Sequence, residues 1–97
     1  MNSQSLDDAL IASLVAQEPA ALDEFYRRYR LLVLSIARRI VVDEWDAEEV
    51  LQDVVWTAWR KAGELRPETR LKAWVAQVAR NAALMLLRKR RRVPTPI

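Results

Sequence analysis

The residues best suited to chemistry lie in the C-terminal third of this chain, where Trp, Gln, Asn and many Arg occur together. Spaced at 100° per residue on a helix, Arg70, Gln77, Asn81 and Arg88 lie beside one apolar side, with Trp74 at the border and Arg80 further round. We give the name polar stripe to the five of these residues that precede the cationic end of the chain: Arg70, Trp74, Gln77, Arg80 and Asn81. Gln and Asn can read base edges through paired donor and acceptor atoms, and Arg can hold phosphate or guanine. A blander interpretation stays open, in which Trp74 is core, Asn81 bonds locally and the arginines only solubilise.

A run of five cations follows the polar stripe at residues 88–92, and no acidic residue comes after Glu68. Residues 1–63 carry seven basic and eleven acidic residues, whereas residues 64–97 carry nine and two. The net charge of +3 is therefore the sum of an acidic N-terminal part and a basic C-terminal part of the chain, which could bind two different partners. Consecutive cations repel one another unless a partner neutralises them. We expect nucleic-acid contacts from Arg88, Lys89, Arg90 and Arg91.

A second candidate surface lies in the middle of the chain. On a helix, five residues fall together on the side opposite the apolar positions, and we call them the acidic face: Glu49, Gln52, Asp53, Trp56 and Arg60. A tryptophan in the middle of a polar surface is typical of binding sites. The alternative is a solvated surface whose Trp56 leans onto a neighbouring loop.

The composition argues against catalysis and against a bound cofactor. The chain has no Cys and no His, so a disulfide, a thiolate metal site and a His-activated nucleophile are all excluded. Its single glycine, Gly63, rules out a Gly-rich phosphate loop. Carboxylates between Asp43 and Asp53 could bind a metal, but helix capping explains their spacing more simply. We expect no enzyme, no cofactor and no metal.

The N-terminus lacks the charged start and apolar run of a signal peptide, and no apolar stretch approaches the length of a membrane span. We therefore expect a cytoplasmic protein that does not insert into membranes. A chain of 97 residues with 52% apolar residues should form one small domain.

Strand signals are nearly absent, and the sequence predicts an all-α fold, a compact bundle of four helices. Ser5 is a candidate N-cap, Pro19 suits a first helical position, and Asp46 with Glu49 resembles a capping box. Gly63 is placed to cap the third helix and Pro67 to open the fourth. The predicted helices cover residues 6–16, 19–41, 46–62 and 67–92, with a linker starting at 93–97.

Apolar positions recur every three or four residues and predict one buried side on each long helix. In the second helix they are Leu22, Phe25, Tyr26, Tyr29, Leu32, Val33, Ile36 and Ile40. In the third they are Ala47, Val50, Leu51, Val54, Ala58 and Ala62, with Val55 and Trp59 at the edge. In the fourth they are Leu71, Val75, Val78, Ala79, Ala82, Met85 and Leu86.

Several of these segments resemble a known family. Residues 46–54 (DAEEVLQDV), Trp59, residues 74–81 (WVAQVARN) and residues 87–91 (LRKRR) are similar to region 2 of bacterial RNA polymerase sigma factors. The nearest group is the extracytoplasmic-function (ECF) class, and the resemblance covers residues 6–92. Three positions depart from the family pattern: Val55 and Leu71 stand where an aromatic is usual, and Met85 where an acid is usual.

The resemblance implies separate roles for the two surfaces. The acidic face would dock on the coiled-coil clamp helices of the polymerase β′ subunit. Residues 63–67 and the fourth helix would engage the promoter −10 element, help melt it and trap a flipped base of the non-template strand. The polar stripe would contact that strand, and residues 88–91 would hold the upstream backbone.

The same resemblance implies an anti-sigma factor as a further partner, and a second, −35-binding domain that this chain would not contain. Residues 1–92 would then form the region 2 domain. Two other functions remain open from the residues alone. One is a helical protein–protein module with a solvated basic tail, and the other is a non-specific nucleic-acid binder.

Overall fold

Four α-helices and one short 3₁₀ turn make up the computed structural model of the chain, which describes the backbone of residues 3–66 and 69–92 and the side chains of residues 6–66 and 69–91. This confirms the predicted all-α fold, and the described residues include no strand. The elements are α1 (Ser3–Val15), α2 (Ala20–Arg38), α3 (Glu44–Arg60), η1 (Ala62–Glu64) and α4 (Leu71–Arg92).

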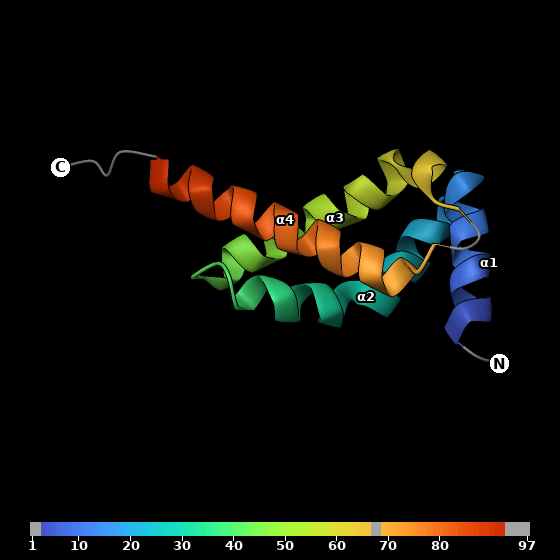
Figure 1. Cartoon of the computed structure of the whole chain (residues 1–97), viewed down its shortest axis with the longest axis horizontal. Helices are drawn as coiled ribbons and strands as arrows, with labels where there is room; N and C mark the ends of the chain where they lie inside the picture. Colours follow the sequence, from blue (N-terminus) through green and yellow to red (C-terminus); the bar gives the residue numbers. More distant parts are fainter. Residues whose placement is uncertain (1–2, 67–68, 93–97) are drawn as a thin grey trace.

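The three long helices lie along the long axis of the molecule, and α1 crosses them at one end (Figure 1). The molecule measures 54 × 22 × 20 Å along its principal axes. Helix α4 packs on both α2 and α3, and its C-terminal turns extend past the end of the bundle (Figure 1). The basic end of α4 therefore projects from the domain.

The core forms where the apolar sides of the helices meet, and Phe25 at its centre is fully buried. Every position predicted to be buried on α3 and η1 is buried, and Val55 and Trp59 are half-buried as expected for the edge. The other large, fully buried side chains are Leu14, Val33, Leu34, Val50, Leu51, Val54, Leu71 and Val75.

Two residues predicted to face the core are exposed. Tyr26 is 43% exposed because the buried side of α2 follows Phe25, Tyr29 and Val33, and Tyr26 lies beside that line. Met85 is 67% exposed. The buried side of α4 is centred on its positions spaced by four, which are Leu71, Val75, Ala79 and Ala83. Met85 lies at the edge of this buried side and faces solvent near α3.

The start of α3 differs from the prediction by one helical turn. Asp43 is the N-cap, with an extended backbone, and its side chain accepts a hydrogen bond of 2.8 Å from the amide of Asp46. Asp46 was predicted to be the cap, but it lies inside the first turn and is buried. Both residues carry a carboxylate, whose oxygen can accept the capping hydrogen bond. Arg38 also secures this turn, since it donates two hydrogen bonds to Glu44 and thereby lowers the pKa of that carboxyl.

Several other predicted boundaries are wrong by a few residues. Helix α1 begins at Ser3, so Ser5 lies inside it, and α2 ends at Arg38 although Val41 is buried beyond it. Gly63 does not cap α3, because that helix ends at Arg60 and the glycine lies in η1 without a positive φ. Helix α4 begins at Leu71. Pro67, predicted to open it, and residues 93–97, predicted to begin a linker, lie outside the described residues.

Helix α1 is attached to the bundle by polar contacts as well as by its apolar side. The Asp7 carboxylate accepts hydrogen bonds from Arg28 at 2.6 Å and from the Tyr29 hydroxyl at 2.7 Å. At the other end of α1, Gln17 adopts a positive φ of 57° and donates from its side chain to the carbonyls of Leu14 and Trp59. These contacts attach α1 to the bundle at both of its ends. Helix α1 lies at the end of the bundle farthest from the basic end of α4 (Figure 1).

Candidate functional surfaces

The acidic face lies on the side of α3 that points away from the core. All five of its predicted residues are exposed: Glu49, Gln52, Asp53, Trp56 and Arg60. Trp56 is 58% exposed, so it does not lean onto a neighbouring loop to bury itself. The Asp53 carboxylate has no hydrogen-bond or ion-pair partner among the described residues. The surface therefore offers a free charge beside a large aromatic ring.

A groove of about 890 Å³ separates the acidic face from α4. Glu49, Gln52, Asp53 and Trp56 contribute to it from α3. Residues Ala82, Met85, Leu86, Arg88 and Lys89 contribute from α4. One wall is acidic and the other basic, with Trp56 and Met85 as exposed apolar side chains between them. The fold thus joins residues that the sequence placed on two separate surfaces.

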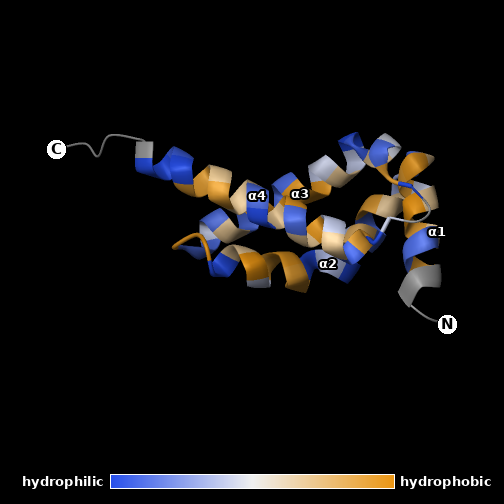
Figure 2. Ribbon diagram, viewed as in Figure 1, coloured by the Kyte–Doolittle hydropathy of each residue, from blue (hydrophilic) through white to orange (hydrophobic). Residues whose placement is uncertain are grey.

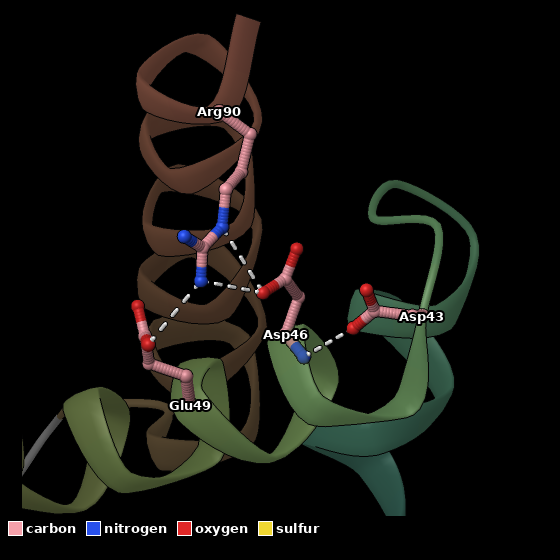
Figure 3. Close-up of polar contacts among 4 residues, drawn as sticks. All are labelled: Asp43, Asp46, Glu49 and Arg90. Carbon is pink, nitrogen blue, oxygen red and sulfur yellow. Dashed lines mark hydrogen bonds and ion pairs between the residues drawn. The ribbon is translucent and has the colours of Figure 1, made fainter. Parts of the chain in front are cut away.

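One residue of the cationic run at residues 88–92, which we call the basic run, forms an ion pair with α3. Arg90 donates from Nε and Nη2 to the same oxygen of Asp46, at 3.2 and 2.9 Å, and its Nη2 lies 3.8 Å from Glu49 (Figure 3). The hydrogen bond to Asp46 raises the pKa of the Arg90 guanidinium further, so its charge is constant. Figure 3 also shows the hydrogen bond that the Asp43 carboxylate accepts from the backbone amide of Asp46. This bond fixes the position of Asp46, whose carboxylate is the acceptor for Arg90.

Three further members of the run face solvent. Arg88, Lys89 and Arg91 are exposed, and none has an ion-pair partner within the described part of the chain. Figure 2 shows the C-terminal turns of α4 as a hydrophilic end. These three cations are therefore available to a polyanion, while Arg90 is largely committed to α3.

The polar stripe begins at Arg70, directly before α4, and continues along the N-terminal half of that helix. Arg70, Gln77, Arg80 and Asn81 are exposed. Trp74 is half-buried and packs against the core, so it belongs partly to the core, as the blander interpretation held.

The two amides of the stripe contact each other. The Gln77 amide nitrogen donates to the Asn81 side-chain oxygen at 3.0 Å, so Asn81 does bond locally. This leaves the Gln77 oxygen and the Asn81 nitrogen, an acceptor and a donor, without a further partner in the described residues. Such a pair matches the donor and acceptor pattern of a base edge.

The described residues contain no group of three or more acidic side chains arranged to hold a metal ion. The carboxylates between Asp43 and Asp53 instead cap α3, pair with Arg38 and Arg90, or face solvent. None of the helices described here combines the length and the apolar character that crossing a membrane demands.

The sequence pattern did not single out two residues that the structure makes prominent. Asp46 was taken for a cap, and its pairing with Arg90 joins residues 44 positions apart, which no local spacing reveals. Trp45 falls between the helices predicted for residues 19–41 and 46–62, and the structure places it in the first turn of α3, where it is 85% exposed. Its spacing of eleven residues from Trp56, three helical turns, was the available signal.

Comparison with known proteins agrees with this arrangement. The sequence profile of the family described as Sigma-70 region 2 matches residues 25–93, which include all of α3 and α4. The chain belongs to the Sigma-70 region 2 family. It is 33% identical over 89 residues to the ECF RNA polymerase sigma factor SigM of Mycobacterium tuberculosis, covering 92% of this chain and 45% of that relative.

Two further relatives carry similar names. The RNA polymerase sigma factor CnrH of Cupriavidus metallidurans is 26% identical over 91 residues, covering 94% of this chain and 48% of the relative. The RNA polymerase sigma-H factor of Pseudomonas aeruginosa is 28% identical over 94 residues, covering 97% and 49%. The sigma region 2 domain thus spans about half the length of the curated relatives it matches. No solved structure matches it significantly.

Proposed function

We propose that this sigma region 2 domain of the ECF class docks on the β′ clamp helices of RNA polymerase through its acidic face, and recognises and helps melt the promoter −10 element through α4. The observation that carries the proposal is the division of charge across the groove. Exposed acidic and aromatic side chains line the groove from α3, and exposed cations line it from α4. The domain acts by recruitment and DNA opening, without a catalytic step.

On the polymerase side, Asp53 and Trp56 are the central contacts. Asp53, which has no ion-pair partner among the described residues, supplies a carboxylate for a basic side chain, and Trp56 supplies apolar area that the fold itself does not bury. Gln52 and Glu49 flank them, and Arg60 lies at the far end of the face. Aromatic side chains ringed by polar groups are the usual anchors of protein interfaces.

On the DNA side, the polar stripe takes the opened non-template strand. Gln77 and Asn81 present their unused acceptor and donor to a base, and the exposed arginines Arg70 and Arg80 neutralise phosphates. Trp74 supports the stripe from the core and keeps part of its ring for stacking. Contacts to an unstacked base offset the few kcal/mol that flipping costs.

The basic run binds the duplex upstream of the opened segment. Arg88, Lys89 and Arg91 contact phosphates, which bind proteins without regard to sequence. Arg90 holds the run in place through Asp46 and reaches DNA only by sharing or leaving that ion pair. Family membership also suggests an anti-sigma factor as a partner and the cytoplasm as the place of action.

Selection from a randomised single-stranded DNA pool, with polymerase core and this domain present, tests the proposal without knowing the promoter. We expect enrichment of one short sequence motif that binds several-fold better than a scrambled version. A Gln77→Ala, Asn81→Ala double variant should lose the motif. Equal retention of all sequences would support the alternative of a non-specific binder, and retention of no DNA together with binding to other helical proteins would support an interaction module.

A pull-down of core enzyme tests the polymerase contact separately. The wild-type domain should retain core enzyme, and Asp53→Ala and Trp56→Ala should weaken the complex. Glu18→Ala removes another exposed carboxylate, outside the acidic face, and serves as the matched control. Equal affinity of all four proteins would remove the acidic face from the interface.

A further inference from the structure

Trp45 is one of the most exposed large apolar side chains of the described residues, at 85%. It lies in the first turn of α3, directly after the connection from α2, which also exposes Val42 at 93%. In Figure 2 this connection is coloured as hydrophobic although it lies at the surface. The tip of the α2–α3 hairpin is thus an apolar projection.

The fold does not need an aromatic ring at this position. Asp43 caps the helix, and the Arg38–Glu44 ion pair secures the turn. The buried side of the helix begins at Ala47, on the opposite side from Trp45. A polar residue at position 45 would leave each of these contacts unchanged, so the ring is not explained by stability.

Trp45 instead lines up with the acidic face. Trp45, Glu49, Gln52 and Trp56 follow one another at intervals of four, three and four residues, which places them within about 60° around the helix axis. Trp45 and Trp56 are eleven residues apart, or about 16 Å along the axis. Two exposed tryptophans therefore bracket one straight stripe of α3.

Charge on this stripe indicates what fits between the tryptophans. Glu49 lies on this stripe between the two tryptophans and Asp53 lies beside it, and the stripe carries no basic residue before Arg60. Glu49 approaches Arg90 only at 3.8 Å, and Asp53 has no partner among the described residues. The complementary surface has basic side chains between two apolar sites about three helical turns apart, which one face of a partner helix provides.

We propose that Trp45 is a second anchor of the polymerase-docking surface, so that the partner is a helical segment of the polymerase that covers α3 from Trp45 to Trp56. This rests on the docking role proposed above for the acidic face. It extends that interface by more than one helical turn toward the α2–α3 connection.

The test measures the affinity of the domain for RNA polymerase core enzyme. Trp45→Ala should weaken binding at least about tenfold, as truncation of an anchoring aromatic does, while Trp45→Phe should keep much of the affinity. Leu31→Ala is the matched control, because it removes a large side chain that is 70% exposed on α2. Far-ultraviolet circular dichroism and the thermal midpoint should be unchanged in all three variants.

Each outcome separates the two proposals. Unchanged binding of Trp45→Ala, with weakened binding of Asp53→Ala and Trp56→Ala, would overturn the second anchor and leave the docking role in place. Equal losses in Trp45→Ala and Leu31→Ala would show general apolar adhesion and would also overturn it. Failure of the wild-type domain to bind core enzyme would overturn both proposals.

Discussion

Arg90, near the end of α4, donates hydrogen bonds from Nε and Nη2 to one oxygen of Asp46 in the first turn of α3, at 3.2 and 2.9 Å. The pair joins the basic end of α4 to α3, the helix that carries the acidic face. Asp43 fixes the acceptor in turn, since it caps the helix through the Asp46 amide. The direction in which residues 88–91 extend from the bundle therefore depends on Asp43, the N-cap of α3, and on Asp46 of that helix.

Removal of this ion pair should loosen the basic end while leaving the fold intact. Arg90 is half exposed, so Arg90→Ala should lower the thermal midpoint by less than about 4 °C. Arg91→Ala should not change the midpoint, because Arg91 is exposed and makes no ion pair in the described part of the chain.

For binding to duplex DNA the order of the two effects should reverse, so that Arg91→Ala changes the affinity more than Arg90→Ala does. Arg91→Ala should reduce the slope of log affinity against log salt by about 1, as loss of one phosphate contact does. Arg90→Ala should reduce that slope less. Binding titrations at several salt concentrations check this, and a larger effect of Arg90→Ala on the slope would make Arg90 a phosphate contact.

The amide pair of the polar stripe should determine sequence preference and not general affinity. Gln77→Ala should relax the preference at one base of the single-stranded motif, at a cost of about 1–3 kcal/mol for the preferred base. Arg88→Ala should weaken all sequences alike. Competition binding with single-base variants of the motif separates the two effects, and uniform weakening by Gln77→Ala would exclude base reading by this residue.

The core should depend strongly on its central aromatic. Phe25 is fully buried and stacks at 5.3 Å on Tyr29, so Phe25→Ala should destabilise the domain by about 3–5 kcal/mol. That is a large part of the stability of a small domain. Leu31→Ala should change it by less than about 0.5 kcal/mol. Urea unfolding followed by circular dichroism measures both, and similar values for the two variants would contradict the packing described here.

Alkaline pH should destabilise the domain through Tyr29. Burial of the hydroxyl, together with its hydrogen bond to Asp7, raises the pKa of Tyr29 well above the ordinary value of about 10. A raised pKa in the folded state means that the stability it reflects is complete below the unfolded value and is lost as pH rises beyond it. Stability should therefore fall above a pH of about 10, and Tyr29→Phe should show a weaker fall.

Spectrophotometric titration checks the same group directly. The chain has two tyrosines, so the Tyr26→Phe variant leaves Tyr29 as the only source of tyrosinate absorbance. The Tyr29 hydroxyl should ionise over the same pH range in which the domain unfolds, as measured by circular dichroism. Ionisation near pH 10 in a domain that stays folded would show that the hydroxyl is not held in this way.

Local spacing was sufficient for much of the fold. Val50, Val54 and Ala58 could be assigned to the core, and Asp53 and Trp56 to the surface, because a helix places residues three and four apart on one side whatever it packs against. The identity of the buried side of α3 follows from this rule alone. Boundaries were less certain, since Asp43 and Asp46 offer the same capping chemistry at neighbouring turns.

Other features required the relative placement of helices. Met85 is apolar and correctly spaced, yet it is exposed, because α2 and α3 meet α4 along a line centred on Val75 and Ala79. The Gln77–Asn81 hydrogen bond is local and was left open as an alternative. The groove and its two oppositely charged walls arise only where α3 and α4 diverge.

For this protein, the amino-acid sequence by itself determined the helical class, the buried side of α3 and the separation of acidic from basic surface, since each depends on residues close together in the chain. Only the tertiary structure shows that Arg90 pairs with Asp46, that Met85 lines a groove and that Trp45 is exposed. The reason is physical. Burial and pairing between helices depend on the crossing and axial position of each helix, which helical spacing does not specify.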